Sequence, residues 1–235
     1  MKVDIITIFP EIFDFYLSQS LISKAQKKGV LKIKAHQLRD FTTDKHQTVD
    51  DKPFGGGRGM VLKVEPILKA IQLLEKFQET RNKKQTNSKF KIKNSKIILF
   101  SPRGKKFNQK MAHDWAKQDQ LIFICGRYEA IDERVAKNLA TDIVSIGDYV
   151  LMGGELPALV AIESVARLLP GAVGNSEALI GERITNKGGF VEYPQYTRPE
   201  VVEIKGKKAR VPKVLLSGNH KEIEKWRAKN SKIIL

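Results

Sequence analysis

Short apolar segments alternate with amphipathic ones through the first 170 residues, and this alternation constrains the fold more than any other feature of the sequence. Apolar runs of strand length occur at 3–9, 31–36, 96–100, 121–125 and 143–146. Apolar positions repeat at helical spacing in the segments 10–29, 65–77, 107–115 and 157–169. Strands and helices that alternate in this way predict an α/β fold with a mostly parallel sheet and right-handed crossovers.

The composition and the hydrophobic periodicity of the sequence change after the last of these predicted helices. Residues 172–190 hold four glycines and show little periodicity, which is typical of a flexible linker. The remainder, 191–235, is short and basic, with one clear helical segment at 221–229. We therefore expect a large domain over 1–171 and a small, mainly helical domain after the linker. Residues 80–94 are rich in Lys, Asn, Gln and Thr and predict a disordered surface insertion in the large domain.

Positive charge is concentrated in two segments. The chain carries 42 Lys and Arg against 26 Asp and Glu, a formal net charge of +16. Residues 76–96 contribute +7 and residues 205–235 contribute +8, so the rest of the chain is nearly neutral. Such segments indicate a polyanionic partner, because each phosphate contact releases counterions. Solvated Lys-rich loops are the alternative, and charge alone does not decide between the two.

Several other classes of protein are excluded by the sequence. No stretch approaches the ~18 apolar residues of a membrane helix, and the N-terminal apolar run lacks the small-residue cleavage site of a secretory signal. The single cysteine, Cys125, excludes an internal disulfide and a zinc site built on cysteines. The four histidines have no His-x-x-x-His spacing, so we expect no metal site. These features predict a cytoplasmic protein.

Glycines and charged residues gather after the predicted strands. The Gly-rich stretch 55–59 lacks the Lys-Ser/Thr of a P-loop and does not follow a strand, so a turn is its simpler interpretation. Segments 125–129 and 145–157 each follow a strand, where α/β sheets bind ligands. Segment 189–199 places aromatic, acidic and basic residues on a proline-restricted stretch. Together these segments predict a small-molecule site beside a nucleic-acid-binding surface.

The same segments carry a resemblance to a known family. Matching stretches follow the family's order at 8–13, 39–41, 48–57, 101–102, 125–135, 145–157, 196–201 and 215–220. On these residues the sequence resembles the bacterial tRNA (guanine-N1)-methyltransferase family, TrmD. The resemblance implies methylation of the guanine at position 37 of tRNA, just 3′ of the anticodon.

This resemblance also implies a fold that periodicity alone does not predict. The apolar pattern by itself suggests an ordinary Rossmann-like sheet, and true knots are essentially absent from such folds. The family instead implies a SpoU–TrmD (SPOUT) fold, in which a deep trefoil knot in the α/β domain binds S-adenosylmethionine. It further implies a homodimer whose active site takes residues from both protomers.

Site residues follow from the resemblance position by position. The cofactor site is expected to consist of Ser101, Pro102, Gly126, Tyr128, Ile146, Gly147, Asp148, Tyr149, Val150, Leu151, Gly153, Gly154 and Pro157. Backbone groups there would form hydrogen bonds with the edge of the adenine ring, while Tyr149 and Leu151 would shape the cavity. The expected catalytic residues are Glu192, Arg167 and Glu129. The family has Asp at the position of Glu192, so this chain keeps the carboxylate and adds a methylene group.

The chemistry of the reaction suits these residue types. Guanine N1 carries a weakly acidic proton and accepts a methyl group poorly until that proton leaves. A carboxylate such as that of Glu192, placed within ~3 Å of N1, can accept the proton. A guanidinium such as that of Arg167 can stabilise the negative charge that develops toward O6. Glu129 is expected to help orient the site.

Contacts to tRNA are expected from six residues: Arg58, Arg198, Lys207, Lys208, Arg210 and His220. Two alternative functions stay open. One is a knot-fold tRNA-binding protein with weak or no methyl transfer, favoured only by Glu192 and by less C-terminal helix than the family usually has. The other is a SPOUT methyltransferase that acts on another RNA position, such as a ribose oxygen. The carboxylate at position 192 argues against this second alternative.

Overall fold

The structure of the chain is a computed structural model, and it describes residues 1–82, 94–173, 183–184 and 190–234. The chain divides into two compact units, Met1–Ser176 and Glu177–Leu235. The predicted insertion over 80–94 and the predicted linker over 172–190 lie mostly outside the described residues.

A five-stranded parallel sheet forms the centre of the N-terminal unit, in the strand order β2-β1-β6-β5-β8. Its strands are β1 (Lys2–Thr7), β2 (Lys32–Gln37), β5 (Ser95–Lys106), β6 (Gln120–Ile124) and β8 (Asp142–Ser145). Every residue of β6 is buried, as expected of a central parallel strand that is covered on both faces. The predicted α/β fold with a parallel sheet is confirmed.

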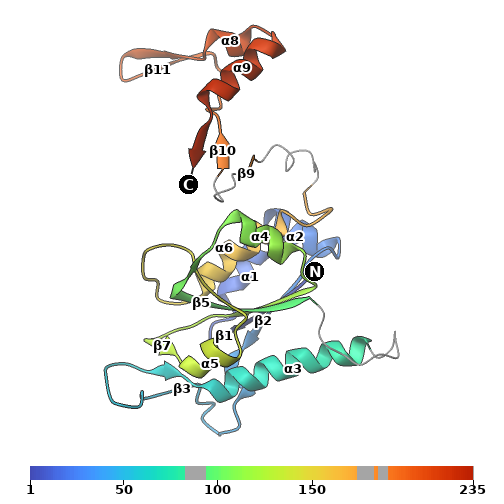
Figure 1. The fold of residues 1–235 in the computed structure, drawn as a ribbon, viewed down its shortest axis with the longest axis vertical. Coiled ribbons are helices and arrows are strands. Elements are labelled where there is room, and N and C mark those ends of the chain that lie inside the picture. Colours follow the sequence, from blue (N-terminus) through green and yellow to red (C-terminus); the bar gives the residue numbers. More distant parts are fainter. Residues whose placement is uncertain (83–93, 174–182, 185–189, 235) are drawn as a thin grey trace. The chain divides into compact units, whose positions relative to one another are not determined.

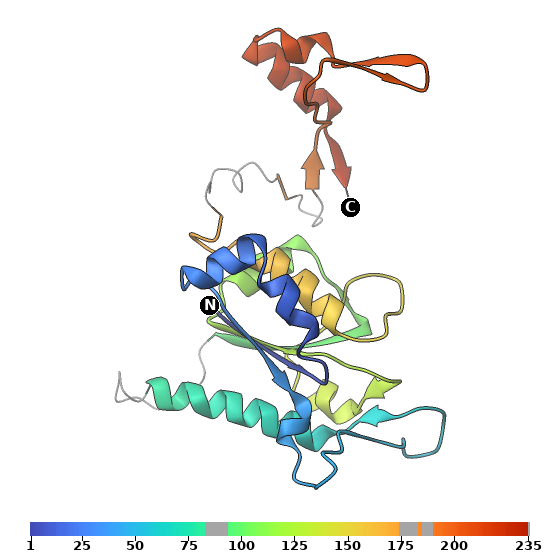
Figure 2. The ribbon, with the colours of Figure 1, turned by 180° about the vertical axis from the view of Figure 1, so that it is seen from behind.

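Helices cover both faces of this sheet, as Figures 1 and 2 show from opposite sides. On one face lie α1 (Ile12–Leu17), α2 (Ser20–Lys27), α4 (Gln109–Ala116) and α6 (Glu155–Ala166). On the other lie α3 (Val64–Asn82) and α5 (Glu133–Asn138). Successive side chains of β1 point to opposite faces, so Ile5 packs in the first core and Ile6 in the second.

The single helix predicted over 10–29 is wrong, because the structure has two helices there. α1 ends at Leu17 and α2 begins at Ser20, whose φ is +51°. The hydroxyl of Ser18 donates to the carbonyl of Phe15 at 2.7 Å, a local bond that competes with continuation of the helix. The break lets Phe13 of α1 and Ile22 of α2 both reach the core under α6.

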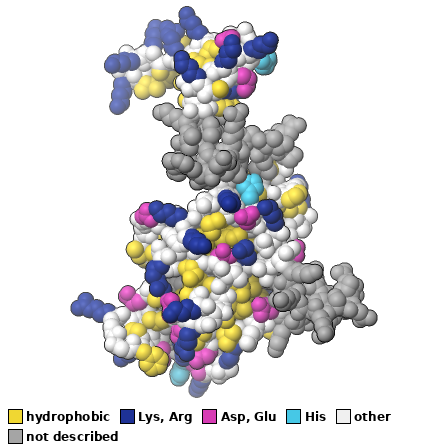
Figure 3. Space-filling model, in the orientation of Figure 1, with side chains coloured by type: hydrophobic (Ala, Val, Ile, Leu, Met, Phe, Trp, Pro, Cys, Tyr) yellow, Lys and Arg dark blue, Asp and Glu magenta, His cyan; other side chains and the backbone are white. Residues whose placement is uncertain are grey.

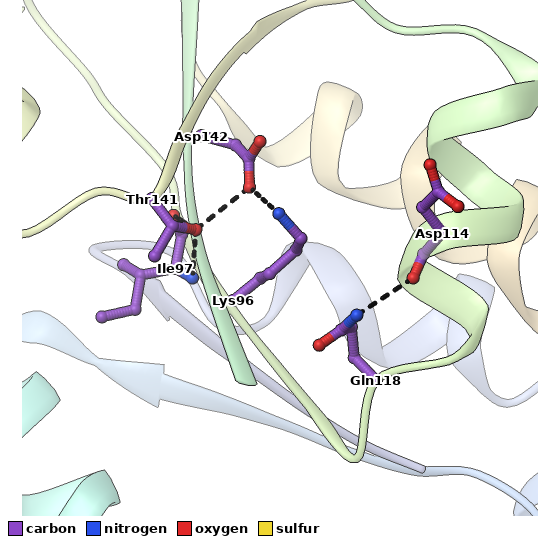
Figure 4. Close-up of polar contacts among 6 residues, drawn as sticks. All are labelled: Lys96, Ile97, Asp114, Gln118, Thr141 and Asp142. Carbon is purple, nitrogen blue, oxygen red and sulfur yellow. Dashed lines mark hydrogen bonds and ion pairs between the residues drawn. The ribbon is translucent and has the colours of Figure 1, made fainter. Parts of the chain in front are cut away.

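Strand β5 runs past the end of its buried part and returns to β8. It pairs with β8 at 98–100 and again at 105–106, with a register shift between the two stretches. A Cβ on Gly104 would lie 2.4 Å from the amide nitrogen of Val144, so only glycine allows this approach. At the other end of the pairing, Lys96 and Thr141 both contact the carboxylate of Asp142, at 2.7 and 3.0 Å (Figure 4).

A second, small sheet joins the loops beside the central one. It consists of β3 (Asp50–Asp51), β4 (Val61–Leu62) and β7 (Ala130–Ile131), in that order. A 3₁₀ helix, η1 (Leu38–Phe41), follows β2. These strands have two residues each, too short for an apolar pattern to predict. They connect the glycine-rich loop over 55–59 to the segment that follows β6.

The C-terminal unit contains strands as well as the predicted helix. The helix predicted at 221–229 is α9 (His220–Asn230), and a short α8 (Lys213–Leu216) precedes it. β9 (Arg183–Ile184), β10 (Phe190–Glu192) and β13 (Lys232–Ile234) form an antiparallel sheet, while β11 (Val201–Ile204) and β12 (Lys207–Arg210) form a hairpin. Lys and Arg side chains crowd the surface of this unit (Figure 3).

Candidate active site

The carboxyl ends of three central strands border a cleft. A cavity of about 1300 Å³ is lined by residues 101–103 within β5, by residues 126–134 after β6, and by residues 145–147 and 149–154 at and after the end of β8. Residues 51–54 and 61–65, which include parts of the small sheet, line it as well. Ligands of open α/β sheets bind at this edge. The volume suffices for a molecule of nucleoside size or larger.

Of the residues expected to bind a cofactor, all but Asp148 line this cleft. They come from three segments of the sequence, the middle of β5, the residues after β6 and the residues between β8 and the start of α6: Ser101, Pro102, Gly126, Tyr128, Ile146, Gly147, Tyr149, Val150, Leu151, Gly153, Gly154 and Pro157. Asp148 is exposed and forms an ion pair with Lys106 at the end of β5. The structure therefore brings twelve of the thirteen expected residues together around one cleft. Asp148 instead forms an ion pair on the exposed side of its loop.

Gly147 and Gly154 allow the loop between β8 and α6 to fold tightly. The hydroxyl of Ser145 accepts a hydrogen bond from the amide of Gly147 at 3.2 Å. A Cβ on Gly147 would lie 2.2 Å from Cε1 of Tyr149, and one on Gly154 would lie 2.7 Å from Cα of Cys125. The amide of Gly154 donates to the carbonyl of Gly126 at 3.0 Å. These contacts attach the loop to the end of β6 and leave its backbone beside the cleft.

A buried carboxylate beneath the cleft was not found by sequence reasoning. Glu155, the first residue of α6, is 1% exposed. It accepts hydrogen bonds from the hydroxyl of Thr7 at 2.8 Å and from Nε of Arg127 at 3.0 Å. The Arg127 guanidinium also lies 4.8 Å from the centroid of the Phe9 ring. Burial, together with the negative charge of Glu155, raises the pKa of the Cys125 thiol well above its ordinary value, against the opposing charge of Arg127.

Tyr128 and Glu129 both line the cleft. Tyr128 has a φ of +61°, an uncommon conformation for a side chain of its size. Partial burial and a hydrogen bond to Asp50 raise the pKa of its hydroxyl, while Arg39 acts in the opposite direction. The Glu129 side chain lies beside Gly59. A Cβ on Gly59 would lie 2.4 Å from Cγ of Glu129. The glycine-rich loop thus leaves room for Glu129.

Comparisons with known proteins show which family the chain belongs to. The family model described as tRNA (Guanine-1)-methyltransferase TrmD matches residues 1–233. The chain belongs to the TrmD family.

Relatives named tRNA (guanine-N(1)-)-methyltransferase match this TrmD chain over almost its whole length. The protein of Dictyoglomus turgidum is 48% identical over 231 residues, which cover 98% of this chain and 85% of the relative. That of Carboxydothermus hydrogenoformans is also 48% identical, covering 98% and 83%. The crystal structure of the tRNA (m1G37) methyltransferase from Aquifex aeolicus superposes with a TM-score of 0.72 at 36% identity, covering 96% of this chain and 87% of that one.

The structure separates the catalytic residues expected for a TrmD protein. Glu129 lines the cleft, whereas Arg167 follows the last turn of α6 and lines a different, small pocket with Glu163 and Leu21. Helix α6 begins at the cleft and spans 12 residues, about 18 Å. Arg167 therefore lies about one helix length from the start of α6, which borders the cleft that Glu129 lines. Glu192 is the last residue of β10, in the C-terminal unit.

The residues expected to contact tRNA are all exposed. Arg58 lies on the glycine-rich loop of the N-terminal unit. The C-terminal unit supplies Arg198, Lys207, Lys208 and Arg210 on or before its hairpin, and His220 at the start of α9. Among the described residues, no three His, Cys, Asp or Glu side chains gather as a metal site, and no helix is long and apolar enough to cross a membrane.

Proposed function

We propose that this TrmD-family chain transfers a methyl group from S-adenosylmethionine to N1 of guanine 37 in tRNA. The observation that carries the proposal is the family match over residues 1–233, because it includes every loop of the cleft. A tRNA substrate also implies a cytoplasmic enzyme. The basic hairpin, with Lys207, Lys208 and Arg210 exposed, supports binding to the phosphates of tRNA.

The cleft has the chemistry that S-adenosylmethionine requires. Its loops are rich in glycine, so amides and carbonyls of 145–154 can hydrogen-bond to an adenine edge. Side chains of Tyr149, Leu151 and Pro157 add apolar surface for the purine ring. The bound cofactor supplies an electrophilic methyl group on a sulfonium sulfur. The chain's own task is to hold the acceptor base in line with that methyl group.

In the reaction we propose, Glu192 accepts the proton of guanine N1. The freed electron pair on N1 then forms the new N–C bond as the S–C bond breaks, leaving a neutral thioether. Negative charge that develops toward O6 is stabilised by the guanidinium of Arg167. Glu129 orients the base at the rim of the cleft.

A second copy of the chain would complete this site. Arg167 lies about one helix length from the cleft that its own chain provides. The helices α1 and α6 also expose large apolar side chains: Ile12, Phe15, Tyr16, Leu156 and Val160. Apolar surface of this kind marks an interface. A twofold homodimer that buries it would bring the Arg167 end of one α6 toward the cleft of the partner.

The trefoil knot also belongs to this proposal. Two features support it. The extension of β5 wraps against the backbone of Val144, with Gly104 at the crossing. The loop that follows β8 then returns to the end of β6, where Gly154 binds Gly126. The β5 extension and the loop after β8 thus cross at one edge of the sheet. A knot requires such a crossing, because one segment must pass through the loop that another segment forms.

Methyl transfer to defined transcripts tests the proposed function. The chain is incubated with methyl-labelled S-adenosylmethionine and unmodified tRNA, and the labelled nucleoside is identified and mapped. We expect 1-methylguanosine at position 37, and no label in a matched transcript with adenosine at that position. Label on a ribose oxygen or on another base would support the second alternative. Binding of tRNA without any transfer would support the first.

A further inference from the structure

Part of the cleft is bordered by residues outside the expected cofactor set. Residues 51–54 and 61–65 line it from the small sheet and from the loop between β3 and β4, and we call them the β3–β4 side of the cleft. The cavity holds about 1300 Å³, more than the roughly 300–1,000 Å³ of a site for one small ligand. The β3–β4 side therefore leaves room for a second group beside the cofactor. Under the proposed function that group is the guanine that accepts the methyl.

The loop between β3 and β4 is fixed at its base and projects from the unit at its tip (Figure 1). At the base, the amide of Glu129 donates to the carbonyl of Met60 at 3.2 Å. At the tip, the amide of Gly56 donates to the carbonyl of Pro53 at 3.3 Å, and Gly55 and Gly56 have φ values of +85° and +79°. Glycine adopts these angles without strain. A Cβ on either glycine would have no neighbouring heavy atom within 4 Å, so the turn lies in open space.

Phe54 stands on this loop with its whole side chain exposed. Its exposed fraction is 102%, the highest among the large hydrophobic residues that the structure describes. It nevertheless lines the cleft, and it is the one aromatic residue on the β3–β4 side. Burial of a phenylalanine ordinarily stabilises a fold, and this chain does not use Phe54 in that way. The ring is therefore available to contact a ligand in the cleft.

Two cationic side chains stand on the same loop as Phe54. Lys52 and Arg58 are both exposed, and Lys52 also lines the cleft. An aromatic ring between cations is the arrangement with which proteins bind unpaired nucleotides, because the base stacks on the ring while the cations contact phosphates. A protein surface could also cover an exposed ring, but these two positive charges favour an anionic ligand. The loop thus suits a nucleotide of the tRNA.

We propose that Phe54 stacks on the guanine that receives the methyl group. The inference rests on the proposed function, because only an RNA substrate brings an unpaired purine to this cleft. N1 lies on the Watson–Crick edge of guanine, so the base must be unpaired and removed from its stack before it can react. A ring against one face of the base holds its plane and leaves the N1 edge open. Without the ring, a smaller fraction of the bound tRNA has its guanine seated.

The test compares substitutions at Phe54 with a matched control. Phe54→Ala removes the side chain, Phe54→Leu keeps an apolar group without an aromatic face, and Phe54→Trp keeps such a face. Leu73→Ala removes an exposed apolar side chain from α3, outside the cleft. In single-turnover assays at saturating cofactor and tRNA, we expect Phe54→Ala and Phe54→Leu to slow transfer about 5- to 150-fold, the range for one lost stack. Phe54→Trp and Leu73→Ala should stay within about 3-fold of the parent.

A spectroscopic measurement separates stacking from other causes of a slow rate. A tRNA with 2-aminopurine at position 37 is bound in the presence of S-adenosylhomocysteine, and the fluorescence of the probe falls when the purine stacks. We expect strong quenching with the parent and with Phe54→Trp, and largely restored fluorescence with Phe54→Ala. The dissociation constant for tRNA should change less than about 3-fold, because the phosphate contacts remain.

Three results would overturn the inference. They are a parent-like rate for Phe54→Ala, equal quenching by parent and Phe54→Ala, and a lower molecular mass of Phe54→Ala in light scattering, which would assign the ring to an interface between two copies of the chain. If the parent methylates guanine 37 and Phe54→Ala matches it, the proposed function stands and this inference alone fails. If the parent transfers no methyl to guanine 37, the proposed function fails and the inference falls with it.

Discussion

Nε of Arg127 and Oε2 of Glu155 lie 3.0 Å apart beneath the cleft and join the segment after β6 to the start of α6. The Glu155 carboxylate is almost fully buried, and its other oxygen accepts from Thr7 at the end of β1. The carboxylate of Glu155 therefore links α6 to β1 and to the segment after β6. Arg127 lines the cavity, as does Gly154 just before Glu155, so the pair lies at the wall of the cavity.

Removal of Arg127 should be costly because it leaves a buried charge without its partner. We expect Arg127→Met to lower the free energy of unfolding by about 3–5 kcal/mol, measured by urea denaturation. Arg103 offers the matched control, since its ion pair with Glu133 at 2.7 Å is exposed. Arg103→Met should cost at most about 1 kcal/mol. Equal losses for the two variants would show that Glu155 is paired sufficiently without Arg127.

Acid should weaken the fold through Asp4. Burial alone would raise the pKa of this carboxyl, but hydrogen bonds from His36, Lys2 and Gln120 outweigh it and hold the pKa below its ordinary value of 3.8. A group whose pKa is depressed by folding stabilises the native state above its unfolded pKa. That contribution is lost as the pH falls through the lower, folded pKa. The free energy of unfolding should therefore decline below about pH 3.8.

An Asp4→Asn variant tests this origin of the acid sensitivity. It should be less stable than the parent at pH 7, and its stability should fall less steeply between pH 4 and pH 2. Asp114 provides the control, because its ion pair with Lys117 is exposed and screened by solvent. Asp114→Asn should leave the pH profile close to that of the parent. A profile unchanged by Asp4→Asn would assign the acid sensitivity to other carboxylates.

The β11–β12 hairpin should contribute unequally to tRNA binding. Register pairs Lys208 with Glu203, whereas Lys207 is opposite Ile204 and Arg210 is opposite Val201. Neutralising Lys207 or Arg210 should reduce the slope of log affinity against log salt by about one, as for one lost phosphate contact. Lys208→Gln should reduce it less, because Glu203 already offsets that charge. Affinity for S-adenosylmethionine should not change in any of the three. Identical slopes for parent and variants would assign these residues to solvation.

The sequence predicts the structure best where the local pattern of apolar residues matches the burial of those residues in the fold. Strands β1 and β6 and the first half of β5 are predictable because strands covered on both faces are almost continuously apolar. The segments 126–134 and 145–154 beside the cleft are predictable as a candidate site because glycine and proline cluster there, directly after strands. Two-residue strands such as Val61–Leu62 carry no such pattern, and only tertiary pairing defines them. The pair of Arg127 and Glu155 is likewise a product of the fold, since 28 positions separate its members.

A repeated heptapeptide shows how context decides local structure. Lys-Asn-Ser-Lys-Ile-Ile-Leu occurs at Lys93–Leu99 and again at Lys229–Leu235. The Ile-Ile pair lies in a strand both times, parallel within β5 and antiparallel within β13. The asparagine differs: Asn94 has a φ of +72°, whereas Asn230 is the last residue of α9. Strand propensity of the β-branched pair is local, while the state of the asparagine depends on what precedes it.

The rate of methyl transfer by Glu192→Gln tests the central claim most directly. Glutamine keeps the size and polarity of the side chain but cannot accept a proton at neutral pH. Single-turnover transfer to guanine 37 should slow by about 10²–10⁴-fold, with cofactor and tRNA affinities nearly unchanged. Glu192→Asp should retain activity, because it keeps the carboxylate. Transfer by Glu192→Gln at the parent rate would contradict the account, since the proton would then leave to another group or to water.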